Sequence, residues 1–141
     1  MAIPASVALS LAAALVAASC SSFRDAGVHL MSPCTDGVCK ADVSVQSCEN
    51  GTLPVVPDPL PVPSPNNLEW TVVTPGYKFA SNGIVVQGTG FTSPHATPNG
   101  KKFIVHDDHT DLRTDIKYTV RVIRESDGVE CHPNDPLISN Q

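Results

Sequence analysis

The densest group of chemically active side chains in this chain is the segment His106–Asp111, which reads His-Asp-Asp-His-Thr-Asp. Imidazole and carboxylate groups are ligands that divalent cations accept. Alternate residues of an extended chain share a face, so His106 lies with Asp108 while Asp107 lies with His109. Neither face alone supplies three or four ligands, and we interpret the segment as a solvated loop whose aspartates hold turns. The candidate metal ligands within it are His106, Asp108, His109 and Asp111.

Other catalytic signatures are missing from the sequence. There is no Gly-x-Ser-x-Gly elbow, and Gly88-Thr89-Gly90 lacks the Gly-Lys-Ser/Thr ending of a phosphate loop. A net charge of −5 argues against a nucleic-acid partner, because phosphate binding needs a basic face. We therefore predict a non-enzymatic protein without a cofactor. The alternative is a divalent-metal-dependent binding protein or hydrolase that uses the loop from His106 to Asp111.

Four of the five cysteines lie beyond the first 30 residues, and four cysteines can pair in three ways. Residues 40–47 alternate apolar and polar side chains, which predicts a strand whose ends lie about 30 Å apart. Since bridged Cα atoms lie within about 7 Å, Cys39 cannot reach Cys48. Cys34 is too close in sequence to Cys39 to return to Cys48. The remaining pairing joins Cys34 to Cys39 and Cys48 to Cys131.

A zinc site is the competing interpretation of the cysteines. The Cys-x4-Cys pair and the distant Cys131-His132 could supply soft ligands. Zinc-binding pairs are usually spaced more closely, and export favours disulfides over free thiols. We therefore prefer two disulfides.

The N-terminus carries an apolar run, Val7–Ala18, which is too short to span a bilayer but has the length of a signal peptide. Small residues precede Cys20, and Ser19-Cys20-Ser21-Ser22 resembles the lipobox of bacterial lipoproteins, in which the cysteine is lipidated. We therefore predict export to the periplasm, to the outer membrane or out of the cell, with a membrane contact through lipid on Cys20. If translation starts at Met31, the protein is cytoplasmic instead.

Composition and length predict one β-rich domain. The chain has 13 prolines, 41% hydrophobic and 16% charged residues, which favours loops and strands over long helices. We divide it into a signal peptide (residues 1–19), a tether with a cysteine loop (20–37) and a single domain (38–141). In residues 53–65 every second or third residue is proline, which fits an irregular edge segment lying on that domain.

Several short alternating runs predict an all-β fold, a small β-sandwich that is loosely immunoglobulin-like. The expected strands are 40–47, 68–73, a hairpin of 77–79 and 84–86 around Asn82-Gly83, then 101–106 and 116–123. Residues 88–100 and 107–115 are expected to be loops. Trp70 and Tyr118 stand in apolar alternations, so we expect both at core or half-buried positions.

A set of short motifs spans about half of the chain. They are Trp70-Thr71, Gly76-Tyr77-x-Phe79, Asn82-Gly83-Ile84, Tyr118-x-Val120-x-Val122, and Cys131 ahead of Asp135-Pro136. In these motifs the chain resembles small bacterial exported β-domain proteins and lipoproteins. The resemblance implies a fold and carries no activity. Together with the signal segment, it predicts a structural or interaction role in the cell envelope, with a protein partner that the sequence does not identify.

Overall fold

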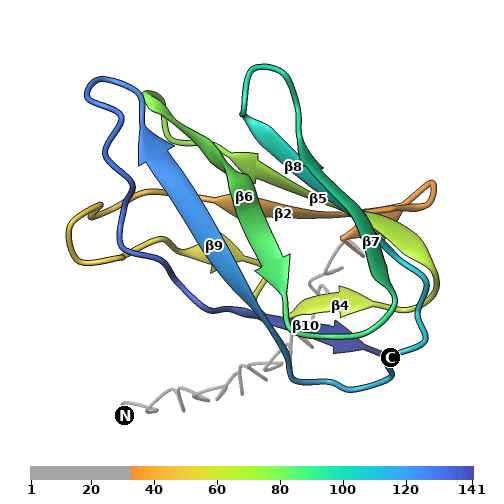
Figure 1. Cartoon of the computed structure of the whole chain (residues 1–141). Coiled ribbons are helices and arrows are strands. Elements are labelled where there is room, and N and C mark those ends of the chain that lie inside the picture. The colour runs from red at the N-terminus through yellow and green to blue at the C-terminus, as the bar shows by residue number, and fades with distance from the viewer. Residues whose placement is uncertain (1–32) are drawn as a thin grey trace, which may run out of the picture.

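A computed structural model describes residues 33–141 of the chain, so the predicted signal peptide, Cys20 and most of the tether lie outside it. Within this range the protein consists of strands joined by turns and loops, with no helix (Figure 1). The ten strands are β1 (Cys34–Thr35), β2 (Val38–Val43), β3 (Val55–Val56), β4 (Leu60–Val62), β5 (Asn66–Val72), β6 (Tyr77–Val86), β7 (Phe91–Ala96), β8 (Lys102–Asp107), β9 (Ile116–Arg124) and β10 (Leu137–Asn140).

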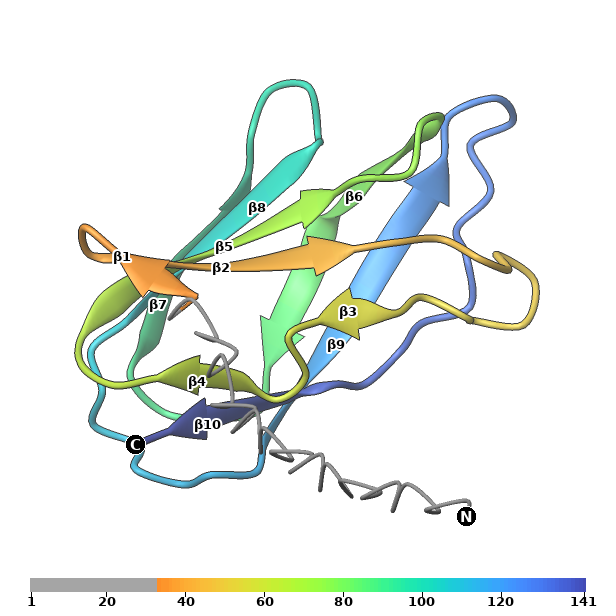
Figure 2. The ribbon, with the colours of Figure 1, turned by 180° about the vertical axis from the view of Figure 1, so that it is seen from behind.

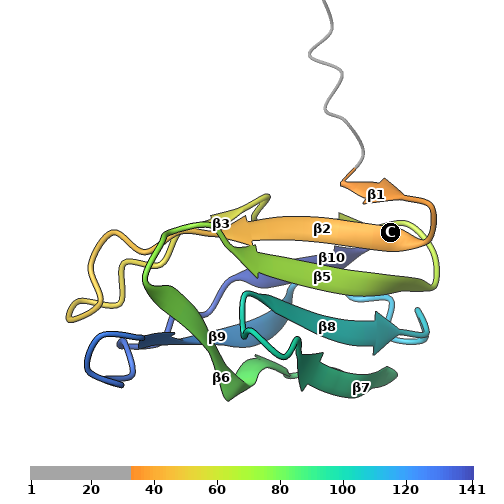
Figure 3. The same cartoon turned by 90° about the horizontal axis from the view of Figure 1, so that it is seen from above.

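The strands form two sheets that pack face to face. The first has the order β1-β2-β5-β8-β7, with β3 pairing β2 on the same side as β1, and the second has the order β4-β10-β9-β6. Figures 2 and 3 show β9 and β6 in one layer and β2, β5 and β8 in the other. Two pairings, β2 with β5 and β4 with β10, are parallel, and the rest are antiparallel. The predicted small β-sandwich is confirmed.

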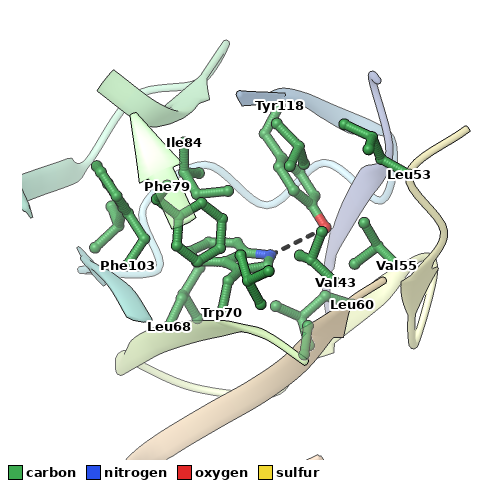
Figure 4. Packing of buried hydrophobic residues seen from close by; sticks show 14 of the residues in the cluster. Val43, Leu53, Val55, Leu60, Leu68, Trp70, Phe79, Ile84, Phe103 and Tyr118 are labelled. Atoms are coloured by element: carbon green, nitrogen blue, oxygen red, sulfur yellow. Dashed lines mark hydrogen bonds between the residues drawn. The ribbon is translucent and has the colours of Figure 1, made fainter. Parts of the chain in front are cut away.

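The core fills the space between the sheets. Alternate residues of β5 and β9 are buried, which is why Trp70 and Tyr118 face each other from opposite sheets. Their ring centroids lie 5.2 Å apart, and the indole Nε1 of Trp70 donates a hydrogen bond of 3.1 Å to the Tyr118 hydroxyl (Figure 4). Phe79 and Phe103 form a second cross-sheet pair at 5.8 Å. The prediction of core or half-buried positions for Trp70 and Tyr118 is confirmed, and both side chains are fully buried.

The cysteine pairing in the structure is the one expected from the sequence: Cys34 with Cys39, and Cys48 with Cys131. The strand that carried the argument is shorter than expected, since β2 ends at Val43. The sheet also begins earlier than the expected domain boundary at residue 38, because β1 pairs with β2 across the Asp36-Gly37 turn. The first bridge therefore closes a hairpin within the sheet.

The expected hairpin around Asn82-Gly83 is wrong. Residues 77–86 are one continuous strand, β6, and both halves pair with β9 across a register shift between Phe79 and Ile84. The Asn-Gly pair lies in this irregularity, where a Cβ on Gly83 would fall 2.7 Å from the Cβ of Phe79. Glycine is needed there for close packing and not for a two-residue turn.

Two strands of the structure, β7 and β10, were not predicted from the sequence. β7 lies in residues 88–100, which were expected to be a loop because they are rich in Gly, Pro, Thr and Ser. Its residues are half-exposed or exposed in the structure, so the strand has no apolar alternation. It is an edge strand, where the missing backbone donor of Pro94 is tolerated. β10 was not predicted, although three of its four residues are buried between β4 and β9.

The proline-rich segment lies on the domain as expected. Its apolar residues Leu53, Val55, Leu60 and Val62 are buried, and they belong to the core. Two short edge strands form within it: β3 at the margin of the first sheet and β4 at that of the second. No helix within residues 33–141 is long and apolar enough to cross a membrane.

Candidate functional site

The first two candidate metal ligands, His106 and Asp108, each have a different partner within the protein. His106 is on the exposed face of β8, where its Nδ1 lies 2.9 Å from the side-chain oxygen of Asn67 on β5. Asp108 begins the following loop and accepts hydrogen bonds from the backbone N–H and the hydroxyl of Thr110, at 3.0 and 2.7 Å. These bonds lower the pKa of Asp108 and hold a local turn.

The other two candidates, His109 and Asp111, connect the loop of residues 108–115 to its surroundings. His109 contacts the second sheet, and Asp111 bonds to the turn of residues 87–90. His109 has a positive φ of 61°, and its Nε2 lies 2.9 Å from the carbonyl oxygen of Val62 on β4. A carbonyl can accept but not donate, so Nε2 carries the proton. Asp111 accepts bonds of 2.9 and 2.7 Å from the Arg113 guanidinium and one of 3.2 Å from the Thr89 N–H. These donors hold the pKa of Asp111 well below its usual range.

The structure therefore does not gather the four candidate ligands. In the described part of the chain, no three His, Cys, Asp or Glu side chains are placed to hold a metal ion. The polar segment instead fastens the loop of residues 108–115 to its surroundings. Arg113 also donates a bond of 3.1 Å to the carbonyl of Gln87, which links this loop to the turn that precedes β7.

Asp107 belongs to the same segment but was not among the candidate metal ligands. It ends β8 with no exposed surface, whereas the loop was expected to be solvated throughout. Its Oδ1 accepts a bond of 2.8 Å from the His109 N–H, and burial raises the pKa of its carboxyl. The neighbouring amide of Asn140 is also buried. Asp107 continues the alternation of Phe103 and Val105 along β8 and so shares their inward face, but its charge led us to assign it to the loop.

A pocket of about 300 Å³ opens where the edges of the two sheets approach, between β6 and β7. Its apolar lining includes Ile84, Val86, Phe91, Phe103 and Val105. Ser81 and Asn82 from the irregular part of β6 supply polar groups at its side. A size of 300 Å³ and an apolar lining with few polar groups are typical of small ligand sites.

A second hollow of about 380 Å³ continues along the same seam toward Gly100 and shares Ser81 with the first. No strand within residues 33–141 pairs with the outer edge of β6. The Gln87 N–H donates to the Lys117 carbonyl on β9. In an antiparallel pair the backbone N–H and C=O groups of successive residues point alternately toward the partner strand and away from it. The backbone groups of Ile84 and Val86 therefore point away from β9, toward the outer edge of β6. The pocket therefore borders an open strand edge.

The sequence held one indirect signal for this pocket. Both flanking strands have register shifts, in β6 between Phe79 and Ile84 and in β7 between Thr92 and His95, where Ser93 has a positive φ of 54°. Asn82-Gly83 lies at the first shift and Pro94 at the second. We had expected a hairpin turn at Asn82-Gly83 and a loop around Pro94. Such bulges bend strands and are common beside binding sites.

Comparisons with known proteins give no family for this architecture. No protein-family model, no curated protein and no solved structure matches the chain. The resemblance to small bacterial exported proteins therefore stays a prediction from the sequence motifs.

Proposed function

We propose that this protein is an exported β-sandwich domain, anchored to a membrane by lipid on Cys20, that acts in the cell envelope by binding and not by catalysis. The observation that carries the proposal is the pairing of all four cysteines between residues 33 and 141. Disulfides persist in oxidising compartments such as the periplasm and are rare in the cytosol. The pairing therefore supports export and argues against the alternative start at Met31.

The tether has a length that suits an anchored domain. Residues 21–33 separate Cys20 from β1, and an extended chain reaches about 3.3 Å per residue, so the domain could stand about 40 Å from the lipid. At that full reach the sandwich would stand clear of the bilayer surface. A protein partner or a ligand could then approach the pocket between β6 and β7.

Two observations support a binding role: the pocket between β6 and β7, and the engagement of the candidate metal ligands in hydrogen bonds within the protein. The pocket offers apolar surface beside an unpaired strand edge, which suits an apolar group or an extended peptide. The candidate metal ligands are engaged in bonds within the protein, so we do not propose the metal-dependent alternative.

Labelling tests the anchor. When the full chain is expressed in a bacterium with an alkyne analogue of palmitate, we expect label on the wild type and none on Cys20→Ala. A matched control, Cys34→Ala with Cys39→Ala, should keep the label, because it removes two other cysteines without touching the lipobox. A wild type without label would refute the anchor. Intact mass under non-reducing conditions then separates a soluble exported protein from a reduced cytoplasmic one.

Dye binding tests the pocket. Val85 lines it and is 43% exposed, so Val85→Glu should fold normally while placing a negative charge at the opening, where it repels an anionic dye. We expect 1-anilinonaphthalene-8-sulfonate to bind the folded wild type, and the variant to bind it about tenfold more weakly, a difference of about 1.4 kcal/mol. Val129→Glu is the matched control, since Val129 is 47% exposed and does not line the pocket. Equal binding by all three proteins would contradict this assignment.

A further inference from the structure

The chain contains three Asn-Gly pairs, at Asn50-Gly51, Asn82-Gly83 and Asn99-Gly100. In such a pair the backbone nitrogen of the glycine can attack the side-chain amide carbon of the asparagine, because glycine has no side chain to crowd the approach. The attack needs a glycine N–H that can give up its proton and a main chain that can turn about the asparagine. The three pairs have the same chemistry, so the fold decides which of them reacts.

The pair Asn99-Gly100 is held in a hydrogen-bonded turn. The N–H of Gly100, a buried residue, donates a bond of 2.8 Å to the Thr97 carbonyl. The side-chain oxygen of Asn99 accepts a bond of 2.9 Å from the Thr97 hydroxyl and one of 3.0 Å from the Lys101 N–H. Attack would disturb these bonds, and each bond that is lost raises the barrier to the reaction. This pair is therefore protected.

The pair Asn82-Gly83 is held inside a strand. β6 pairs with β9 on both sides of it, at Phe79 and at Ile84. Gly83 is buried, and a Cβ on it would fall 2.7 Å from the Cβ of Phe79. Turning the main chain about Asn82 would pull Gly83 out of this packing and strain the pairing on either side. This pair is protected as well.

The pair Asn50-Gly51 lies in the turn between β2 and β3, which a bridge between Ser47 and Thr52 closes (Figure 2). Asn50 is exposed, and its backbone N–H donates a bond of 3.3 Å to the Ser47 hydroxyl. The Gly51 carbonyl accepts a bond of 3.0 Å from the Leu53 N–H. No group of residues 33–141 accepts from the Gly51 N–H or bonds to the Asn50 amide. Hydrogen bonds within this range therefore restrain neither the attacking nitrogen nor the group that it attacks.

We propose that Asn50-Gly51 is a site of spontaneous deamidation and that the fold protects the other two pairs. The Gly51 nitrogen loses its proton and forms a bond to Cγ of Asn50, while the Cγ–Nδ2 bond breaks and the amide nitrogen leaves as ammonia with that proton. Water then opens the succinimide at either carbonyl, placing its hydroxyl on the carbon and its other hydrogen on the Gly51 nitrogen. The products are aspartate and isoaspartate at position 50.

The surroundings of the turn decide what the product does to the protein. Isoaspartate adds an extra atom to the backbone. Gly51 lies against His132, since a Cβ on Gly51 would fall 2.8 Å from the imidazole Nδ1, so the longer chain has to move outward into solvent. The His132 N–H donates a bond of 2.9 Å to the Cys48 carbonyl, and the bridge from Cys48 to Cys131 anchors the same segment. Modification therefore loosens the turn and leaves the core packed.

Peptide mass spectrometry on the purified, oxidised protein tests the assignment. After incubation in mildly alkaline buffer, digestion and fragmentation follow the conversion of amide to acid at each pair. We expect Asn50 to react about tenfold faster than Asn82 and Asn99, or more, a factor that corresponds to about 1.4 kcal/mol in the barrier. In urea with the bridges reduced, the three pairs should react at similar rates, because the unfolded chain restrains none of them.

Variants confirm the reacting position. Asn50→Gln should abolish the early conversion, since glutamine has to close a larger ring, whereas Asn82→Gln, at another exposed position, should leave it unchanged. An isoaspartate-specific methyltransferase should label aged wild type and not aged Asn50→Gln. No conversion at Asn50 in the folded protein, or equal conversion at Asn82 or Asn99, would overturn the proposal. The same ranking in urea would also overturn it, because local sequence and not the fold would then set the rates.

Discussion

Replacing Cys48 and Cys131 together with alanine is expected to lower the free energy of unfolding by about 4 kcal/mol. The bridge joins residues 83 apart in sequence, and closing so long a loop removes much of the conformational entropy of the unfolded chain. Both cysteines are buried, and alanine avoids placing a hydroxyl in the core. The total free energy of unfolding of a small domain is about 5–15 kcal/mol, so the variant would be close to unfolding at 37 °C. Urea titration of the purified, oxidised proteins measures the difference.

The bridge between Cys34 and Cys39 provides the control for that experiment. It spans a sequence separation of 5, so the same entropy relation gives a loss of about 2 kcal/mol for the double alanine variant. The short bridge braces a two-residue edge strand, whereas the long bridge fixes the chain segment after β2 to the segment after β9. Equal losses from the two variants would show that loop length does not govern their effect.

Trp70→Ala is expected to destabilise the protein by about 3–5 kcal/mol, the range for removing a fully buried large aromatic side chain. Trp70 has no exposed surface and lies at the centre of the contact between β5 and β9 (Figure 4). The surrounding strands are held by two hydrogen-bonded sheets and cannot collapse into the space left behind. Thermal unfolding with near-ultraviolet circular dichroism would detect the loss of packing.

The hydrogen bond between these rings can be separated from their packing. Tyr118→Phe keeps the ring but leaves the buried indole N–H of Trp70 without its acceptor, which is expected to cost about 1–3 kcal/mol. In Trp70→Phe the donor is absent, so adding Tyr118→Phe should then cost less than it does alone. Strictly additive losses would show that the bond contributes nothing beyond the packing of the two rings.

The hydrophobic core and the pocket between β6 and β7 share side chains. Phe103 and Val105 alternate along β8 with exposed residues, and the same side chains that fill the core also form the floor of the pocket. The pocket is thus the place where the core reaches the surface between β6 and β7. Its shape depends on both sheets keeping their separation, which the Trp70–Tyr118 contact helps to set.

The sequence by itself determined the all-β class, the cysteine pairing and the strongest strands. Alternation in β5 and β9 is visible because one face of each strand meets the core and the other is more exposed. The cysteine pairing was predictable because β2, although it ends at Val43, carries the chain away from Cys39 before it reaches Cys48. These are local properties, set by side-chain type and by the length of an extended backbone.

The tertiary structure alone decided the strands and the site that depend on partners distant in sequence. β7 and β10 have no alternation of their own and exist because β8, β4 and β9 offer them hydrogen bonds. Residues 77–86 form one strand because β9 pairs with both halves, and not the hairpin that Asn82-Gly83 indicated. Asp107 is buried in a place where Asn140, 33 positions away in the sequence, is one of its neighbours. A sequence pattern records the preference of a segment, whereas burial depends on which other segments come to cover it.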